Sequence, residues 1–355
     1  MTYIQNRLAE VRRLMKANKL PALLVSQDQN RRYLSGFKGS AGSLLITQQQ
    51  AILATDFRYW EQATQQASDF TLYQAKGRVQ DFLPGVIEAA GSPKRVGFET
   101  GTVTVAMFET MKTALPKVKW VKTNGLIEQV RWVKDADEIA QTRRAIELAE
   151  NAFAEVIARI EPGMTEAQIA WELEVHMRTH GATGLAFDTI VASGPNAALP
   201  HYHAGQRPVQ EGEPITIDWG AELDGYRSDL TRTIVLGEPD AKFREVYDIV
   251  LKAQMNAINN IKANITGKEA DAFARDIIAA AGYGEYFGHS LGHGVGLATH
   301  EGPRASYLAE DERLPIGALI TAEPGIYIPG WGGVRIEDMI VVEENGVEVL
   351  SHLPK

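Results

Sequence analysis

The densest group of ionisable rings lies in the segment FGHSLGHGVGLATHEGP, residues 287–303. It contains three of the eight histidines of the chain, His289, His293 and His300. Imidazoles so close together can bind a metal ion, transfer protons or hold a substrate, and no HExxH sequence is present to choose among these roles. The choice depends on which other side chains the fold brings to these rings.

The first of two predicted β-hairpins carries a pair of aspartates. Its strands, residues 216–220 and 226–236, flank an Asp-Gly turn signal, a dipeptide typical of tight hairpins. Pairing centred just before Asp224 would place Asp218 opposite Asp229. Two like charges directly across a strand pair are destabilising, so this arrangement needs a positive charge between them.

The second predicted hairpin repeats the arrangement with glutamates. Its strands, residues 319–328 and 333–342, would pair about Gly330 and place Glu323 opposite Glu337. Burial of carboxylates in apolar strands raises their pKa values or requires a cation. Four carboxylates on a solvated sheet face are the alternative, but two symmetric pairs in apolar strands favour a site for two metal ions.

One imidazole is expected to complete this oxygen-rich ligand set. The chain has no cysteine, so any metal must be held by oxygen and nitrogen. Such ligands suit manganese, cobalt, zinc or ferrous iron better than a soft metal. His293 is the candidate imidazole because Gly292 and Gly294 beside it let the backbone come close and turn sharply,.

The elements that must position these residues fall into two regions. Residues 1–131 alternate short helices and strands, which predicts a small α/β domain,. Its glycine-rich segment GFKGSAGS, residues 36–43, precedes a strand rather than a helix and is expected to be an ordinary loop,. The second domain is expected to comprise residues 132–355.

The second region contains an internal duplication. Each half has a long amphipathic helix, a break, a second helix ending at glycine, and a strand pair,. Gly163 and Gly267 lie 104 positions apart, and Asp218 and Glu323 lie 105 apart. We therefore predict an α+β fold with two halves about a pseudo-twofold axis, whose four hairpin strands share one sheet.

Composition excludes several classes of partner. The net charge of -9, without a cluster of Lys and Arg, argues against nucleic acid or an anionic membrane,. No apolar stretch is long enough to cross a bilayer, and the first twenty residues do not resemble a signal peptide. A cytoplasmic location is expected.

The motifs resemble those of the pita-bread metallopeptidases, which include methionine aminopeptidase, aminopeptidase P and prolidase. The N-terminal segments YLSGFKGSAGSLLIT and ATDFRYWEQA are similar to the noncatalytic domain of the proline-directed branch. The resemblance implies a C-terminal pita-bread fold preceded by a creatinase-like N-terminal domain. The matching C-terminal segments are FDTIVASGPNAALPH (187–201), TIDWGAELDGYRSDLTRT (216–233), HSLGHGVGLATHEGP (289–303), TAEPGIY (321–327) and GVRIED (333–338).

The resemblance also implies a ligand set for two divalent ions in each subunit, with manganese expected and cobalt or zinc as alternatives. The residues at the ligand positions are Asp218, Asp229, His293, Glu323 and Glu337.

Other residues at matching positions are expected to act on the substrate. Glu323 would carry the proton from the nucleophile to the leaving amine. His201 and His300 would stabilise the oxyanion, and His289 would line the pocket for a proline ring. Arg335 lies two positions before Glu337, on the same strand face, and is expected to orient that carboxylate.

Arg304, in HEGPR, is expected to meet either a substrate carboxylate or a neighbouring acid, and the role of His203 stays open. The implied activity is that of a Xaa-Pro aminopeptidase acting on peptides with proline at the second position, and the N-terminal segments favour it. The alternative is a Xaa-Pro dipeptidase (prolidase), in which a loop or partner subunit blocks the space beyond the proline. A remoter alternative is a metal-free relative that serves as a binding module or hydrolyses a small amidine. A homodimer is expected from the family.

Overall fold

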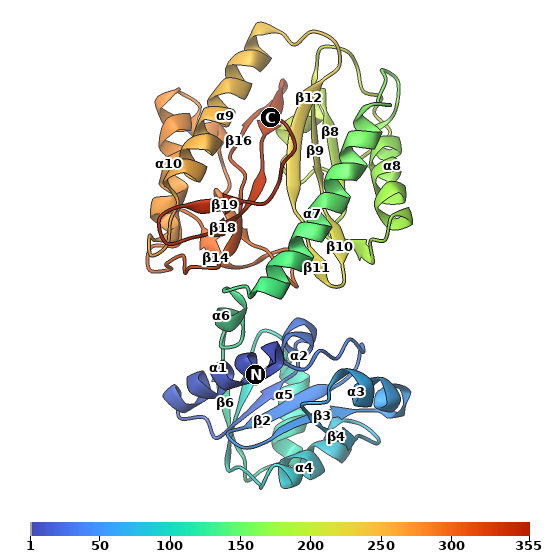
Figure 1. The fold of residues 1–355 in the computed structure, drawn as a ribbon, viewed down its shortest axis with the longest axis vertical. Helices are drawn as coiled ribbons and strands as arrows, with labels where there is room; N and C mark the ends of the chain where they lie inside the picture. Colours follow the sequence, from blue (N-terminus) through green and yellow to red (C-terminus); the bar gives the residue numbers. More distant parts are fainter. Residues whose placement is uncertain (1) are drawn as a thin grey trace. The chain divides into compact units, whose positions relative to one another are not determined.

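The computed structural model describes residues 2–355 and divides into two compact units, Met1–Arg131 and Trp132–Lys355. Both units are drawn in Figure 1. Within the described residues, no helix is both long and apolar enough to cross a membrane.

The first unit is built on a six-stranded sheet in the order β4-β3-β2-β1-β5-β6. Strand β2 is antiparallel to both neighbours, whereas β3–β4, β1–β5 and β5–β6 are parallel pairs. The strands are β1 (Ala22–Val25), β2 (Ser43–Thr47), β3 (Ala51–Thr55), β4 (Thr71–Gln74), β5 (Arg95–Glu99) and β6 (Lys119–Thr123). The helices are α1 (Tyr3–Ala17), α2 (Asp28–Ser35), α3 (Trp60–Gln66), α4 (Val79–Ala89), α5 (Val105–Ala114) and α6 (Glu128–Arg131), with a 3-10 turn at Phe57–Tyr59.

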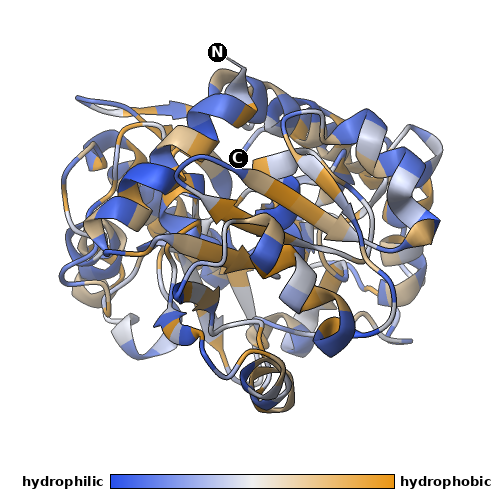
Figure 2. Ribbon diagram, turned by 90° about the horizontal axis from the view of Figure 1, so that it is seen from below, coloured by the Kyte–Doolittle hydropathy of each residue, from blue (hydrophilic) through white to orange (hydrophobic). Residues whose placement is uncertain are grey.

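The alternation of helices and strands in this unit confirms the predicted α/β arrangement. Three elements were not predicted, namely α2, β6 and α6. Strand β6, with the sequence KWVKT, lies at the sheet edge and has lysines at its first and fourth positions, so it lacks a continuous apolar signal. The glycine-rich segment after α2 is a loop, as expected, and Gly36 closes the helix at φ 74°. In Figure 2 the strands are mostly orange, whereas the helices alternate between blue and orange.

The second unit begins with one helix pair and repeats it a hundred residues later. Figure 1 shows α7 and α8 on one side of the strands and α9 and α10 on the other. Each helix has an N-cap side chain that accepts a hydrogen bond from the backbone N–H three residues on,. The helices, each preceded by its cap, are Asp135 with α7 (Ala136–Ile157), Thr165 with α8 (Glu166–Thr179), Asp240 with α9 (Ala241–Asn260) and Thr266 with α10 (Gly267–Ala280).

The strands of the second unit form several small sheets in the orders β12-β9-β8, β11-β10-β7, β14-β13-β15-β18-β19 and β16-β17. The first half contains β7 (Gly184–Leu185), β8 (Ile190–Ser193), β9 (Pro214–Trp219), β10 (Ala221–Leu223), β11 (Tyr226–Arg227) and β12 (Leu230–Val235), with a 3-10 turn at Gly194–Ala198. The second half contains β13 (Gly292–Gly294), β14 (Glu301–Ala305), β15 (Leu319–Ala322), β16 (Gly325–Ile328), β17 (Gly332–Arg335), β18 (Asp338–Val342) and β19 (Val347–Val349), with a 3-10 turn at Gly284–Tyr286.

The prediction that the four hairpin strands share one continuous sheet is wrong. No ladder joins β12 to the strands of the second hairpin. The two halves are instead joined by individual hydrogen bonds, among them those in which Glu337 N–H donates to Thr231 O at 3.1 Å and Asp229 N–H donates to Met339 Sδ at 3.2 Å. Each half therefore keeps its own sheets, and these two bonds lie where the hairpin strands are interrupted.

The first hairpin differs from the predicted register by two residues. Asp224 and Gly225 have φ values of 48° and 79° and form the whole of a two-residue loop between Leu223 and Tyr226, as in a type I′ turn. The turn is therefore centred one position later than expected, and Asp218 lies opposite Thr231 instead of Asp229.

The second hairpin has the predicted register. Ala322 lies opposite Asp338 and Gly325 opposite Arg335, which agrees with pairing about Gly330. Both strands are interrupted between these pairs, and the interruptions contain Glu323 and Glu337. Asp229 also lies in an interruption, between β11 and β12. Three of the four acidic residues therefore lie outside regular ladders.

The apolar cores stabilise the strands on which these residues lie. In the first half, Trp219 stacks on Phe153 of α7 with ring centroids 4.4 Å apart, and its indole N–H donates to Ala149 O at 2.8 Å. The second half packs the buried faces of α9 and α10 against β15 to β18. Asp218 therefore lies on a strand that is held against α7 by the next residue, the buried Trp219.

Candidate metal centre

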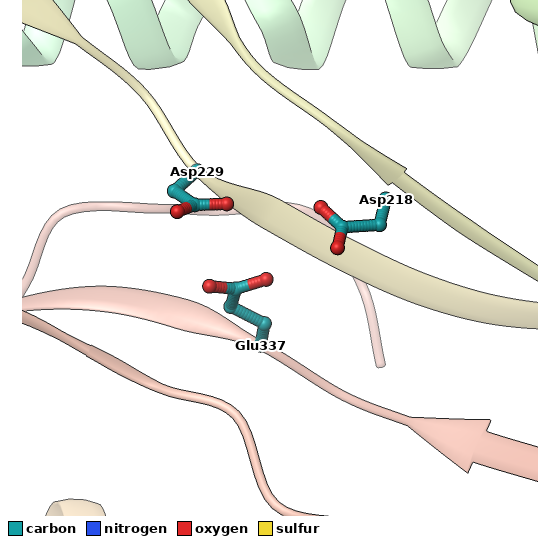
Figure 3. A group of neighbouring side chains, drawn as sticks. All are labelled: Asp218, Asp229 and Glu337. Carbon is teal, nitrogen blue, oxygen red and sulfur yellow. The ribbon is translucent and has the colours of Figure 1, made fainter. Parts of the chain in front are cut away.

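Three carboxylates from the two hairpins converge at the centre of the second unit. One oxygen each of Asp218, Asp229 and Glu337 lies within 4.8 Å of the others. Figure 3 shows Asp218 and Asp229, from the first half, pointing toward Glu337, from the second half. The arrangement brings together residues far apart in sequence, without the direct cross-strand pairing expected for the aspartates.

The oxygens of this triad are only partly satisfied by the protein. Asp218 Oδ2 accepts a hydrogen bond from Arg335, and Glu337 Oε2 accepts one from Thr231 at 2.7 Å. Asp218 Oδ1 and Glu337 Oε1 are buried and have no hydrogen-bond partner among the described residues. Buried carboxylate oxygens without partners are costly, so these two atoms fit the role of cation ligands.

The electrostatics of the triad lead to the same conclusion. Burial, followed by the charge of Asp218, raises the pKa of Asp229 well above its ordinary value. Burial, followed by the charge of Asp229, does the same for the pKa of Glu337. Burial also raises the pKa of Asp218, against the opposing charge of Arg335. A divalent cation would stabilise the ionised forms.

His293 and Glu323 form an ion pair beside the triad. His293 Nε2 lies 3.3 Å from Glu323 Oε1 and 3.7 Å from Asp229 Oδ2. Burial is the largest single influence on the pKa of His293 and lowers it, but the hydrogen bond and charge of Glu323, together with the charge of Asp229, outweigh burial and raise the pKa to about 9. Burial is likewise the largest influence on Glu323 and raises its pKa, but the hydrogen bond and charge of His293, with the charges of His289 and Arg335, together lower it to about 2. A cation bound by His293 and Glu323 would compete with the proton that these two side chains share.

Glycine allows the strand of His293 to approach its neighbour. A Cβ atom at Gly292 would lie 2.1 Å from Thr321 O and 2.6 Å from its hydroxyl. His293 N–H donates to that hydroxyl at 3.1 Å. The glycine before His293 is therefore required by close packing of β13 on β15, in agreement with its predicted role.

Among the described residues, Arg335 contacts Asp218 and reaches Glu337 only through Thr231, which differs from the direct contact expected from sequence. Its guanidinium is buried and donates to Asp218 Oδ2 at 2.6 Å, to Tyr327 Oη at 2.9 Å and to Thr231 Oγ1 at 3.0 Å. Arg335 is the last residue of β17, whereas Glu337 lies in the interruption before β18, so the two residues do not share a continuous strand. Arg335 thus holds Asp218 and leaves Glu337 to Thr231.

A cavity of about 520 Å³ opens over these residues. Its wall includes the remaining predicted substrate residues, namely His201, His289, His300 and Arg304, together with His203. The apolar part of the wall includes Phe187, Ile190 and Pro200.

Two of these histidines have defined surroundings. His289 Nε2 lies 2.8 Å from Tyr327 Oη, and burial lowers the pKa of this ring. The ring of His300 lies 4.1 Å from that of His293, centroid to centroid, and burial followed by the charge of His293 lowers its pKa. The single N–H of neutral His289 is directed at Ser290 O, 2.8 Å from Nδ1, whereas neutral His300 can offer an N–H to a substrate oxygen,.

Arg304 meets a neighbouring acid, one of its two expected partners. Its guanidinium contacts Glu312 Oε2 at 3.1 Å, while its side chain remains about half exposed at the edge of the cavity. Such exposed pairs contribute little to stability, so the guanidinium can exchange Glu312 for a ligand carboxylate at small cost.

Sequence reasoning missed three polar residues that support the centre, Thr231, Thr321 and Tyr327. The two threonines lie two positions from a site carboxylate, Thr231 after Asp229 and Thr321 before Glu323. Because strand residues alternate between faces, this spacing was an available signal. Tyr327 had no such signal, since its contact with Arg335 depends on the hairpin register.

Comparison with known proteins decides the family. Residues 140–344 match the profile of Metallopeptidase family M24. The chain belongs to this family. Residues 7–133 match the Creatinase/Prolidase N-terminal domain. The M24 chain thus has the α+β, pita-bread architecture that its motifs indicated, preceded by a creatinase-like domain.

Relatives of this M24 chain match it over nearly its full length. It is 39% identical to the Xaa-Pro dipeptidase of Pyrococcus horikoshii, covering 99% of this chain and 98% of that protein. It resembles the solved Xaa-Pro dipeptidase from Bacillus anthracis with 42% identity and a TM-score of 0.96, covering 99% and 98% of the two chains. The solved X-Pro aminopeptidase from Thermotoga maritima MSB8 is 41% identical with a TM-score of 0.90, covering 96% and 98%.

Proposed function

We propose that this protein is a Xaa-Pro dipeptidase that depends on two divalent metal ions. The observation that carries the proposal is one cavity whose wall includes both Arg304 and the candidate ligands Asp218, Asp229, His293 and Glu323, with the orphaned oxygen of Asp218 among them. A dipeptide presents a scissile carbonyl close to a free carboxylate, and this arrangement suits both groups.

The sequence alone favoured an aminopeptidase, and the similar proteins favour the dipeptidase alternative. Xaa-Pro dipeptidases are among the similar proteins in both the sequence and the structure comparisons. The aminopeptidase remains the second candidate because a structure of that activity is 41% identical to this chain.

The residues that would hold the two ions divide into the triad and the ion pair. Asp218, Asp229 and Glu337 offer the triad oxygens, and His293 with Glu323 offers the remaining ligands. Divalent cations in such sites polarise carbonyl groups and lower the pKa of water. Manganese is the proposed ion, with cobalt and zinc as alternatives that suit the same donors.

The protein side chains would then perform the remaining steps. Glu323 would accept the proton of the attacking water and pass it to the leaving proline nitrogen. His201 and His300 would donate to the carbonyl oxygen as it gains charge. His289, fixed by Tyr327, would line the proline side of the pocket, and Arg304 would bind the dipeptide carboxylate.

Two substrates of different length test the proposal. We expect the metal-loaded protein to hydrolyse an Xaa-Pro dipeptide with kcat/KM at least about 100-fold above that for Xaa-Pro-Xaa, because only the dipeptide places its carboxylate at Arg304. Comparable cleavage of the tripeptide would establish the aminopeptidase instead. Amidation of the dipeptide carboxyl group is the matched control and should reduce kcat/KM in a similar way.

Metal content tests the remoter, metal-free alternative. The chelated protein should lose activity and regain it on addition of manganese, with two ions bound for each chain. Full activity in chelator, with no divalent ion bound, would contradict the metallopeptidase mechanism. We further propose that the protein is a homodimer and that residues 1–131 take no part in catalysis; light scattering of the purified chain measures the first of these.

A further inference from the structure

Two buried threonines donate hydrogen bonds to carboxylates of the proposed metal centre. Thr231 lies in β12 and Thr321 in β15, and both are fully buried. Thr231 Oγ1 donates to Glu337 Oε2 at 2.7 Å, and Thr321 Oγ1 donates to Glu323 Oε1 at 3.0 Å. Each threonine thus contacts a different glutamate of the second hairpin.

The Thr231 hydroxyl lies between a donor and an acceptor. Arg335 Nε, which can only donate, lies 3.0 Å from Thr231 Oγ1, so the hydroxyl accepts from it,. As an ionised metal ligand Glu337 can only accept, so the hydroxyl directs its single proton at Glu337 Oε2,. This occupies one oxygen of the glutamate and leaves Oε1, the buried atom without a partner, facing the triad.

The Thr321 hydroxyl likewise lies between a donor and an acceptor. His293 N–H donates to Thr321 Oγ1 at 3.1 Å, and the ionised Glu323 carboxylate can only accept, so the hydroxyl directs its proton at Glu323 Oε1,. One threonine thereby links the backbone of His293 to the carboxylate that its ring contacts. The two threonines serve different ligand groups, Thr231 the triad and Thr321 the ion pair.

We propose that Thr231 and Thr321 are positioning residues that separately control the affinity of the two metal ions, Thr231 for the ion held by the triad and Thr321 for the ion held by His293 and Glu323. This inference rests on the proposed function, which requires two ions. Polar groups that orient metal ligands typically contribute 10- to 100-fold to metal affinity.

Calorimetric titration of the full, metal-free chain with manganese tests the proposal without an activity assay. Valine has the shape of threonine but no hydroxyl. We expect Thr231→Val to weaken one binding step about 10- to 100-fold and Thr321→Val to weaken the other by a similar factor. Thr231→Ser and Thr321→Ser keep the hydroxyl and lack only the methyl group, so we expect near wild-type manganese binding from both. If packing of the methyl group controlled the affinity instead, the serine variants would also bind manganese more weakly.

Thr233 supplies the matched control. It is buried on the same strand as Thr231 and exchanges hydrogen bonds with the backbone of Arg335 at 3.0 Å in both directions, but it contacts no carboxylate. Thr233→Val should therefore leave both binding steps within about twofold of wild type. Circular dichroism reports folding of each variant, and Thr231→Ala or Thr321→Ala replaces a valine variant that does not fold.

The outcomes separate this inference from the proposed function. If the wild type binds two ions and both hydroxyl-free variants bind them with unchanged affinity, the positioning role is wrong and the metal centre stands. If both variants weaken the same step, the assignment of one threonine to each ion is wrong. A wild type that binds no manganese contradicts the metal centre and the inference together.

Discussion

The Glu323 carboxylate contacts both the His293 ring and the Thr321 hydroxyl. We expect Glu323→Gln to reduce kcat at least about 100-fold with the fold intact, because an amide cannot accept the proton in general base catalysis. Steady-state kinetics with an Xaa-Pro dipeptide measure the loss. Glu344→Gln, at an exposed carboxylate, is the control. More than a tenth of the wild-type kcat in Glu323→Gln would show that another group moves the proton.

Arg335 and Arg304 form ion pairs of very different burial. Arg335→Met would leave the buried Asp218 without its charged partner, and breaking one side of such a pair costs about 3–5 kcal/mol. Arg304→Met removes a half-exposed pair with Glu312, for which about 0–1 kcal/mol is expected. Urea unfolding of the metal-free variants at neutral pH compares the two losses. Equal free energies of unfolding would contradict the positioning of Asp218 by Arg335.

The identity of the site residues was easier to predict from the sequence than the contacts between them. The spacing of the acidic residues and the resemblance to pita-bread metallopeptidases singled out five residues that the structure places in one cluster. The partner of Arg335 was predicted wrongly because a two-residue spacing gives the strand face only when the strand is continuous. The interruption at Glu337 breaks that condition.

At the scale of elements, the packing of β13 against β15 depends on a residue without a side chain. Gly292→Ala would place a methyl group 2.1 Å from a carbonyl oxygen of β15, so the strand must shift and displace His293. We expect a clear loss of thermal stability and at least about tenfold weaker manganese binding. Gly288→Ala, where an added Cβ meets nothing within 4 Å, is the control and should resemble wild type in both measurements.

The two hairpins show what limits prediction of such elements. The second register was predictable because its strands pair symmetrically about Gly330. The first was missed because both Asp224 and Gly225 adopt positive φ, which moves the centre of the turn by one position and the pairing by two. The separate sheets could not be predicted, since the contacts between the halves join residues more than a hundred positions apart, such as Thr231 and Glu337.

At the scale of the whole molecule, the buried carboxylates link stability to pH. The raised pKa values of Asp229 and Glu337 mean that the metal-free folded chain binds more protons than the unfolded chain above the ordinary values of 3.8 and 4.5. Its free energy of unfolding should therefore fall as pH rises from this range. The raised pKa of His293 adds a further fall between 6.5 and about 9.

Metal binding should reverse this dependence, because the ligands bind as deprotonated groups. We expect the difference in melting temperature between manganese-loaded and metal-free protein to widen as pH rises from about 5 to 8. Thermal denaturation of both forms over this range measures it. A metal-free form that becomes more stable toward pH 8 would contradict the assignment of raised pKa values to the triad.

The bonds that join the two halves also offer a way to observe them. The amide protons of Asp229 and Glu337 are each donated to an atom of the opposite half, Met339 Sδ and Thr231 O. Exchange of these two protons with deuterated water therefore requires the halves to part locally. Their exchange rates would report how often the two hairpins separate. A slower exchange rate with manganese present would show that the bound cations hold the two halves of the second unit together.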